Sequence, residues 1–374
     1  MFSRFRSAPA GGQAQEPTQP EPPIYLISMA GFPNFGDELI AARWLRFLAE
    51  HKPDTEVWLD VREPGTASSL LKGLHPKLHV TNTVFRAIHE YLHFGNRTPA
   101  QLVRDLGSPK FDVGLLELRE AGVIHLLGGG FVNSVWQENK LIVDAMRAAR
   151  EISGARLIAT GQGLMPRIDE NFESFEHVSV RDNPSALELG IERGWDDAYL
   201  LPSAPQPGTF DPQTAELYLC IQNDALDDGA HENLVAFARR QVEYWGIPRE
   251  RTFYVEAIPG DDFAGYDALR DLVGEFLPFA HFWRSGFEFS SNQVWVTTRF
   301  HHHLVGALHG ARGIALSGKA GYYDVKHGSL ADSGTGWILP ENFERLYDMS
   351  ELQAPQSFAP QVRAKYAEAE RIYA

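Results

Sequence analysis

Short apolar segments alternate with amphipathic ones along most of this chain, and this alternation limits the folds that it can adopt. Residues 24–30 (IYLISMA) are apolar and run directly into a turn that contains Gly31, Pro33 and Gly36. Residues 37–50 then place their apolar side chains on one broad helical face. A strand, a glycine-rich turn and a helix in this order open a βαβ unit, the building block of parallel α/β sheets.

The same alternation recurs on both sides of a proline-rich stretch at residues 202–212, which we expect to link two domains. The predicted strands lie at residues 56–61, 123–127, 156–160, 177–180, 216–221, 251–258, 294–298 and 313–316. The predicted helices lie at residues 141–151, 184–189, 232–244, 266–276, 302–308 and 360–373. The sequence therefore predicts an α/β fold with two doubly wound Rossmann-like domains that face a cleft.

These elements also give the expected domain boundaries. The N-terminal domain is predicted to span residues 24–203 and the C-terminal domain residues 204–355, followed by a C-terminal helix at residues 356–374. Residues 1–23 are rich in Pro, Gly, Gln and Ser, a composition typical of a disordered tail.

The charge and the cysteine content exclude several classes of protein. The 374 residues carry a formal net charge of −15, which argues against a nucleic-acid partner, because such proteins bind phosphates largely through Lys and Arg. A single cysteine, Cys220, rules out a disulfide within the chain and fits a cytoplasmic, reducing environment. No apolar run reaches the roughly 18 residues of a membrane span, so we expect a soluble protein, with peripheral membrane contact left open.

Three glycine-rich loops follow predicted strands, where ligands bind in doubly wound sheets. The first contains Asn34, Gly36 and Asp37, and the others contain Gly129 with Gly130 and Gln162 with Gly163. None of them matches the GxGxxG dinucleotide fingerprint or the GxxxxGK[ST] phosphate loop, so we expect neither NAD nor ATP and no other cofactor. Each loop alone is equally compatible with a structural turn.

Cationic side chains stand at two further strand ends. Arg181 ends one apolar run, with Asp182 next to it as a candidate partner, and Arg299 and His301 end another. Residues two apart on an extended segment point the same way, so Arg299 and His301 are predicted to reach one anionic ligand together. Lys326 follows the next strand and adds a further candidate cation. The histidines of this region lack nearby Cys, Asp or Glu at ligand spacing, so no metal site is predicted.

Together these motifs resemble those of the polysaccharide pyruvyl transferase family. The matching stretches, in the family's order, are NFGDELI (residues 34–40), LLGGG (126–130), GQG (161–163), SVRDNPSALELG (179–190), TRFHHHLVGALHG (298–310) and YYDVK (322–326). The resemblance implies a GT-B-like architecture and transfer of a pyruvyl group from phosphoenolpyruvate to sugar hydroxyls, with release of phosphate and formation of a ketal. It also implies Arg299 and His301 as catalytic residues and Arg181 with Arg299 as donor-binding residues.

The residue types agree with that chemistry. The donor carries a carboxylate and a phosphate, so two or three cations, Arg181, Arg299 and Lys326, must converge on it. The enol carbon must accept a proton before a sugar hydroxyl attacks, and a histidine such as His301 suits that transfer. The expected partner is a glycan or a lipid-linked saccharide made at the cytoplasmic face of a bacterial membrane, beside other enzymes of polysaccharide biosynthesis.

Two other functions remain open at this point. A GT-B glycosyltransferase that uses a nucleotide-sugar would show the same alternation, and so would a non-catalytic sugar-binding relative. The sequence also departs from the family pattern, because residues 164–166 lack a glycine before the proline and residues 200–205 lack an acidic residue.

Overall fold

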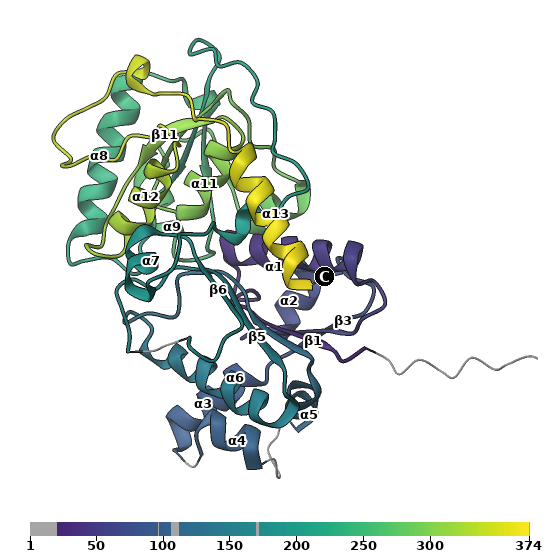
Figure 1. The fold of residues 1–374 in the computed structure, drawn as a ribbon. Helices are drawn as coiled ribbons and strands as arrows, with labels where there is room; N and C mark the ends of the chain where they lie inside the picture. The colour runs from purple at the N-terminus through teal and green to yellow at the C-terminus, as the bar shows by residue number, and fades with distance from the viewer. Residues whose placement is uncertain (1–20, 96, 106–111, 170–171, 374) are drawn as a thin grey trace, which may run out of the picture.

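The computed structural model describes residues 21–95, 97–105, 112–169 and 172–373. Nearly all of the disordered tail predicted for residues 1–23 lies outside these residues. Two parallel sheets organise the described chain, one before and one after the predicted linker (Figure 1). The predicted fold class is therefore confirmed.

The first sheet has six parallel strands in the order β3-β2-β1-β4-β5-β6. The strands are β1 (Ile24–Ile27), β2 (Val57–Asp60), β3 (Leu78–Thr81), β4 (Val123–Leu126), β5 (Arg156–Gln162) and β6 (His177–Val180). The strand order reverses direction between β1 and β4, and ligands of doubly wound sheets bind at such a switch point.

Both faces of this sheet are buried, which explains why its strands are continuously apolar. Ile24 and Leu26 of β1 face one hydrophobic cluster, whereas Tyr25 and Ile27 face another, as the two-residue period of a strand requires. The covering helices are α1 (Phe35–His51), α2 (Pro64–Leu70), α3 (Val84–Phe94), α4 (Pro99–Asp105), α5 (Asp112–Glu120), α6 (Lys140–Ser153) and α7 (Asn183–Leu189).

The second sheet has five parallel strands in the order β11-β10-β7-β8-β9. They are β7 (Glu216–Cys220), β8 (Thr252–Val255), β9 (Glu275–Leu277), β10 (Gln293–Thr297) and β11 (Arg312–Ala315). Its helices are α8 (Ala230–Trp245), α9 (Phe263–Leu269), α10 (Phe279–Ser285), α11 (Phe300–Leu308) and α12 (Tyr323–Asp332). Short 3-10 turns complete the fold at η1 (Gln137–Asn139), η2 (Asp197–Tyr199), η3 (Arg249–Arg251) and η4 (Met349–Glu351).

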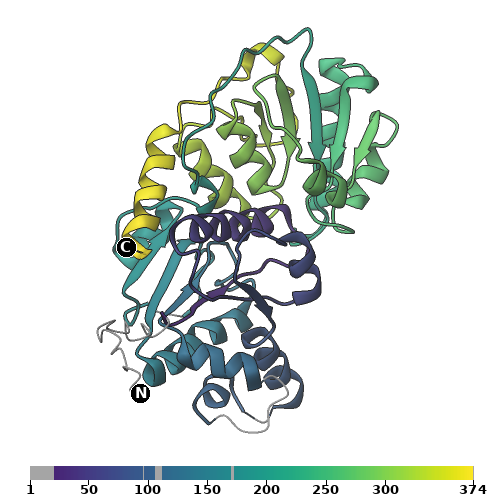
Figure 2. The same ribbon diagram turned by 90° about the vertical axis from the view of Figure 1, so that its right-hand side faces the viewer.

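Helix α1 lies between the two sheets (Figure 2). Its first residue, Phe35, donates its backbone N–H to the carbonyl oxygen of Ala257 in the second half, at 3.0 Å. The two halves therefore meet along α1.

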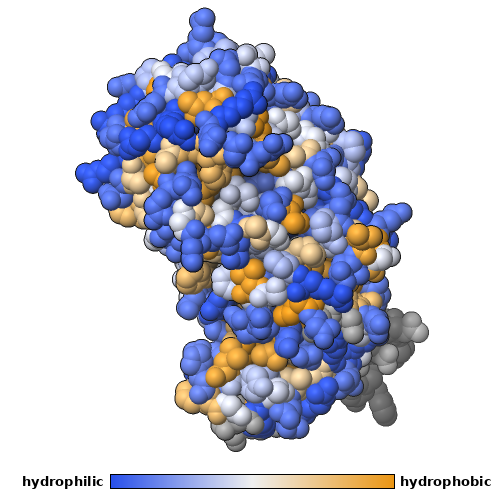
Figure 3. All heavy atoms as spheres, turned by 90° about the vertical axis from the view of Figure 1, so that its left-hand side faces the viewer, coloured by the Kyte–Doolittle hydropathy of each residue, from blue (hydrophilic) through white to orange (hydrophobic). Residues whose placement is uncertain are grey.

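On the face shown in Figure 3 hydrophilic residues predominate, and the hydrophobic ones form separate patches.

The C-terminal helix α13 (Ala359–Tyr373) returns to the first half of the chain and packs beside α1 (Figure 1). Its Lys365 is fully buried and lies between Asp197 of η2 and Glu368, with 2.8 Å from Lys365 Nζ to Glu368 Oε2. A second oxygen of Asp197 accepts hydrogen bonds from Trp44 Nε1 and Thr160 Oγ1, both at 2.7 Å. Buried charges are stable only when they are paired in this way.

Two sequence predictions of local structure were wrong. Residues 266–276 do not form one helix, because α9 ends at Leu269 and the edge strand β9 begins at Glu275. Arg299 and His301 do not share an extended segment, because β10 ends at Thr297, Arg299 is the N-cap residue of α11, and His301 lies in the first turn of that helix. The apolar pattern of a short edge strand does not distinguish it from a helix end.

Candidate active site between the two sheets

A cavity of about 390 Å³ lies between the carboxyl ends of the two sheets. Of the predicted site residues, it is lined by Asn34, Gly36, Asp37, Gly130, Arg181, Arg299, His301 and Lys326. The structure thus brings together the predicted cations and the first glycine-rich loop, from both halves of the chain. Gly129, Gln162 and Gly163 are not among the lining residues.

The start of α1 forms one wall. Asn34 caps the helix: its Oδ1 accepts the N–H of Gly36 at 3.1 Å, and its Nδ2 donates to Asp37 Oδ2 at 2.8 Å. Burial raises the pKa of Asp37, although His301, Lys326 and Arg181 oppose that rise. Gly36 packs directly on His301, since a Cβ placed at Gly36 would lie 1.8 Å from Nδ1 of the imidazole.

Arg181 is held by Asp196 rather than by its neighbour Asp182. Nη1 of Arg181 donates to Asp196 Oδ2 at 2.7 Å, and both residues are buried. Asp182 instead caps α7, where its Oδ1 accepts the N–H of Ser185 at 2.8 Å. A Cβ at Gly163 would lie 2.9 Å from Nε of Arg181. This glycine therefore leaves room for the guanidinium without lining the cavity.

Asp196 also faces His301, with 3.4 Å between Asp196 Oδ1 and His301 Nε2. This is an ion-pair separation but not an aligned hydrogen bond, and Nε2 has no hydrogen-bond partner among the described residues. Burial alone would raise the pKa of Asp196, but His301 and Arg181 hold that pKa well below its usual range. One carboxylate thus serves both a cation and the candidate acid.

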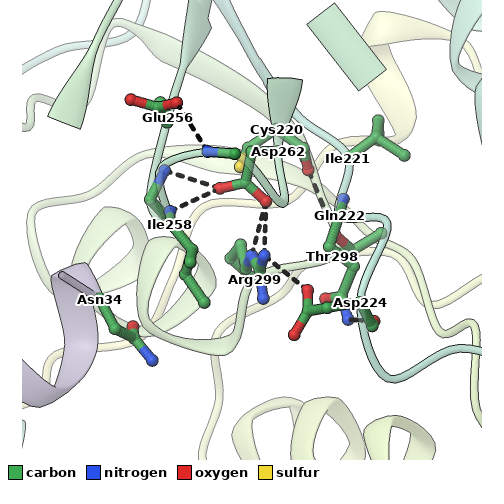
Figure 4. Close-up of polar contacts among 12 residues, drawn as sticks. Asn34, Cys220, Ile221, Gln222, Asp224, Glu256, Ile258, Asp262, Thr298 and Arg299 are labelled. Atoms are coloured by element: carbon green, nitrogen blue, oxygen red, sulfur yellow. Dashed lines mark hydrogen bonds and ion pairs between the residues drawn. The ribbon is translucent and has the colours of Figure 1, made fainter. Parts of the chain in front are cut away.

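Arg299 is paired with two carboxylates (Figure 4). Its Nε and Nη2 both donate to Oδ1 of Asp262, at 2.9 and 2.6 Å, and Nη2 lies 2.7 Å from Asp224 Oδ1. Asp262 is fully buried, and its other oxygen accepts the backbone N–H groups of Ala257 and Ile258, both at 2.8 Å. The orientation of Arg299 is therefore fixed by the turn after β8.

Lys326 enters the cavity from the first turn of α12, the helix that follows β11. Its Nζ lies 3.5 Å from the ring centroid of Tyr322, whose hydroxyl donates to the carbonyl oxygen of Gly130 at 3.0 Å. Burial, followed by the proximity of Arg181, lowers the pKa of Lys326 well below its usual value. A Cβ at Gly130 would meet both Nη2 of Arg181 at 2.8 Å and Nζ of Lys326 at 3.1 Å, so both cations lie over this glycine.

Gln162 and Gly129 support the site from behind. Gln162 is fully buried, and its Nε2 donates to the carbonyl oxygens of Leu127 and Thr160, both at 2.9 Å. Gly129 accepts the N–H of Gly163 at 2.8 Å. The loops after β4 and β5 are thereby tied to each other, and we expect no ligand contact from Gln162.

The other two histidines of the HHH run have different surroundings. His302 is fully buried against Phe35 and Trp295, and burial lowers its pKa to about 3. His303 contacts His327 through the two Nδ1 atoms at 3.1 Å, and His327 Nε2 lies 3.1 Å from the carbonyl oxygen of Thr298.

These contacts determine the tautomers of the histidine pair. His327 Nε2 must donate to the Thr298 carbonyl, so its Nδ1 accepts from Nδ1–H of His303. Nε2 of His303 then accepts from Thr335 Oγ1, at 2.8 Å. Burial lowers the pKa of both rings, in agreement with a neutral pair. His303 therefore belongs to the core and not to the site.

Sequence reasoning missed three acidic residues, Asp196, Asp224 and Asp262. Asp224 and Asp262 lie in the connections after β7 and β8, and Asp196 lies between α7 and η2, but each meets its arginine only through the tertiary fold, so no local spacing identified it. Within the described residues, no group of three or more His, Cys, Asp or Glu side chains is arranged to hold a metal ion. None of the helices described there is both long and apolar enough to cross a membrane.

Comparison with solved structures shows the fold. The UDP-GlcNAc 2-epimerase from Neisseria meningitidis, bound to UDP-GlcNAc, aligns with a TM-score of 0.57 at 9% identity over 93% of this chain and 99% of that chain. The UDP-GlcNAc 2-epimerase from Methanocaldococcus jannaschii aligns with a TM-score of 0.51 at 12% identity, over 93% and 98%. Anabaena HepE, in complex with UDP and glucose, aligns with a TM-score of 0.50 at 11% identity, over 94% of this chain and 95% of that chain. The chain thus has the GT-B-like arrangement of two Rossmann-like domains.

Sequence comparison is more specific about ancestry. No curated protein sequence matches the chain. The family model described as polysaccharide pyruvyl transferase matches residues 34–319, which include every predicted site residue except Lys326. Since this match covers most of the chain, the protein belongs to the polysaccharide pyruvyl transferase family.

Proposed function

We propose that this protein transfers a pyruvyl group from phosphoenolpyruvate to two hydroxyls of a sugar in a glycan or lipid-linked saccharide, forming a ketal and releasing phosphate. Membership of the family supports the reaction class. The observation that carries the donor is the convergence of Arg181, Arg299, Lys326 and His301 on one cavity. Two arginine forks and an ammonium group match a ligand that bears both a carboxylate and a phosphate.

The residues divide the chemistry between them. His301 donates a proton to the methylene carbon of the donor, which leaves the adjacent carbon electron-poor, and a sugar hydroxyl attacks that carbon. Loss of phosphate and attack by a second hydroxyl close the ketal. Asp37 lines the same cavity, and its pKa is raised by burial, so it is placed to take up a proton from an attacking hydroxyl.

Aromatic side chains at the cavity offer a surface for the acceptor. Phe32 and Trp136 line the cavity, yet 55% and 39% of their respective surfaces are exposed. Exposed aromatic faces beside a polar cavity suit an amphipathic ligand such as a sugar ring. The acceptor in this proposal therefore enters past these two residues.

The first test is binding of phosphoenolpyruvate, measured as a thermal shift and by calorimetry. We expect stabilisation of the wild type, and at least a tenfold loss of affinity in Arg299→Ala and in Arg299→Lys, which keeps the charge but loses the fork. Arg62→Ala is the matched control, because Arg62 also lines the cavity but is exposed. Stabilisation by UDP and not by phosphoenolpyruvate would instead favour a nucleotide-sugar donor.

The second test separates binding from chemistry. His301→Gln should bind phosphoenolpyruvate with nearly unchanged affinity, while phosphate release in the presence of a glycan acceptor falls by roughly 10²–10⁴-fold. Full phosphate release by this variant would contradict the acid role of His301.

A further inference from the structure

The two carboxylates that contact Arg299 do so in different ways. Asp262 takes the aligned N–H groups of Nε and Nη2 and is fully buried. Asp224 contacts the same Nη2 at 2.7 Å, but its Oδ1 makes no aligned hydrogen bond to any described residue, and its side chain is 28% exposed. Nη1 of Arg299 donates to none of the described residues. Asp262 is thus a fixed support, whereas Asp224 covers the edge of the guanidinium that faces the cavity.

The cavity as a whole holds balanced charge. Its lining includes four cationic side chains, Arg62, Arg181, Arg299 and Lys326, and four carboxylates, Asp37, Glu138, Asp224 and Asp261. An anionic ligand gains little from a neutral lining unless it takes the place of one of these carboxylates. Asp224 is the lining carboxylate that directly contacts Arg299.

The other two cations that meet at the cavity have a different environment. Nη2 of Arg181 and Nζ of Lys326 both lie over Gly130, and the proximity of Arg181 adds to the lowering of the Lys326 pKa. Nε of Arg181 is buried without a hydrogen-bond partner among the described residues. Two cations this close are stabilised most by a group with two negative charges, such as a phosphate.

We propose that Asp224 marks the carboxylate subsite: its side chain stands where the carboxylate of the donor pairs with Arg299, and the phosphate of the donor lies between Arg181 and Lys326. This inference rests on the proposed function and adds the orientation of the donor to it. Asp224 then determines specificity, because a ligand must supply a carboxylate that replaces that of Asp224 before it reaches Arg299.

The loop that carries Asp224 is suited to such an exchange. Asp224 belongs to the connection between β7 and α8 and not to either element (Figure 4). The next residue, Ala225, has a φ of 48°, in the left-handed region that costs a non-glycine residue roughly 1–2 kcal/mol. Gln222 holds the loop from behind, with Nε2 donating to the carbonyl oxygen of Asp224 at 2.7 Å. A rotation of the Asp224 side chain leaves that bond intact.

The test compares Asp224→Asn with Asp261→Asn, which removes the same charge from the same cavity without touching Arg299. Calorimetry with phosphoenolpyruvate, pyruvate and inorganic phosphate then reads the whole donor and its two halves separately. In Asp224→Asn we expect about tenfold tighter binding of phosphoenolpyruvate and of pyruvate. The affinity of Asp224→Asn for inorganic phosphate should differ from that of the wild type no more than the affinity of Asp261→Asn does.

Two results would overturn the inference. Equal changes in the affinity for phosphoenolpyruvate in the two variants would mean that Asp224 acts only through its charge. A higher affinity of Asp224→Asn for inorganic phosphate, without a higher affinity for pyruvate, would place the phosphate at Arg299. Failure of the wild type to bind phosphoenolpyruvate is a separate result, which refutes the proposed donor, whereas the pyruvate measurement still tests the contact between Asp224 and Arg299.

Discussion

Replacing Gly36 with alanine tests a tightly packed contact between the two halves of the chain. A Cβ at this position would lie 1.8 Å from Nδ1 of His301 and 2.5 Å from Cγ and Cε1, whereas ordinary contact begins at 3.4 Å. The ring or the helix must therefore move by about 1.6 Å. Gly36 is helical and does not have a positive φ, so the substitution meets no backbone strain.

The expected cost follows from two opposing effects. Alanine in place of glycine favours a helix by up to about 1 kcal/mol, and overpacking costs about 1–3 kcal/mol. Gly328→Ala isolates the first effect, because Gly328 lies in α12 and a Cβ there would meet nothing within 4 Å. We expect the free energy of unfolding of Gly36→Ala to lie about 1–3 kcal/mol below that of Gly328→Ala, measured with denaturant. Turnover should fall by about 10²-fold if the ring moves instead.

A double-mutant cycle decides whether the contact is responsible. In a His301→Ala background the imidazole is gone, so Gly36→Ala should behave like Gly328→Ala. A stability cost of the same size with and without the ring would refute the reasoning, because the clash would then not be the cause.

Three further predictions concern buried charges. Lys365→Met leaves Asp197 and Glu368 without their buried cation and should lower the free energy of unfolding by about 3–5 kcal/mol in a urea titration; an unchanged midpoint would show that the pair is not needed. Burial raises the pKa of Glu38 to about 8 from an ordinary 4.5, so its stabilising contribution is complete below pH 4.5 and is lost as pH rises to 8. Glu38→Gln should accordingly gain about 3 kcal/mol relative to the wild type between pH 5 and pH 8, and a constant difference would contradict this. Burial lowers the pKa of His302 to about 3, so its contribution to stability is complete above pH 6.5 and is lost as pH falls towards 3. Between pH 7 and pH 4, His302→Phe should therefore lose less stability than the wild type. We expect a difference of about 1.4 kcal/mol for each pH unit below pH 6.5, measured in parallel urea titrations.

The sequence was sufficient for the central strands of both sheets, because strands buried on both faces are continuously apolar. It was insufficient for two of the edge strands, β3 and β9, although the edge strands β6 and β11 were predicted. β3 and β9 are short and partly exposed, and their residues carry no clear two-residue period. The region between β2 and β4, with its four helices, was likewise not predicted.

The candidate site was predictable in its cations but not in its carboxylates. Arg181, Arg299 and His301 follow predicted strands, and the carboxyl ends of parallel strands meet at one edge, so their convergence follows from topology. Asp196 and Asp262 meet their arginines across 15 and 37 residues of sequence, and no local pattern encodes such a pairing. The extended-segment argument for His301 was wrong, because α11 begins one residue before it.

The return of α13 to the first half of the chain has a mechanical consequence. The polypeptide passes from one sheet to the other after η2 and passes back before α13, and these two elements are in contact. Two crossings that lie side by side restrict the relative movement of the two sheets more than a single linker would. Rotation about the crossings remains possible, whereas sliding or twisting of one sheet against the other is opposed. Lys365 ties the second crossing, at α13, to Asp197. The neighbouring residue Asp196 is the carboxylate that faces both Arg181 and His301. We therefore expect any change in the width of the cavity, and with it in the separation of Arg181 and Arg299, to be mainly a rotation of one half about these two crossings.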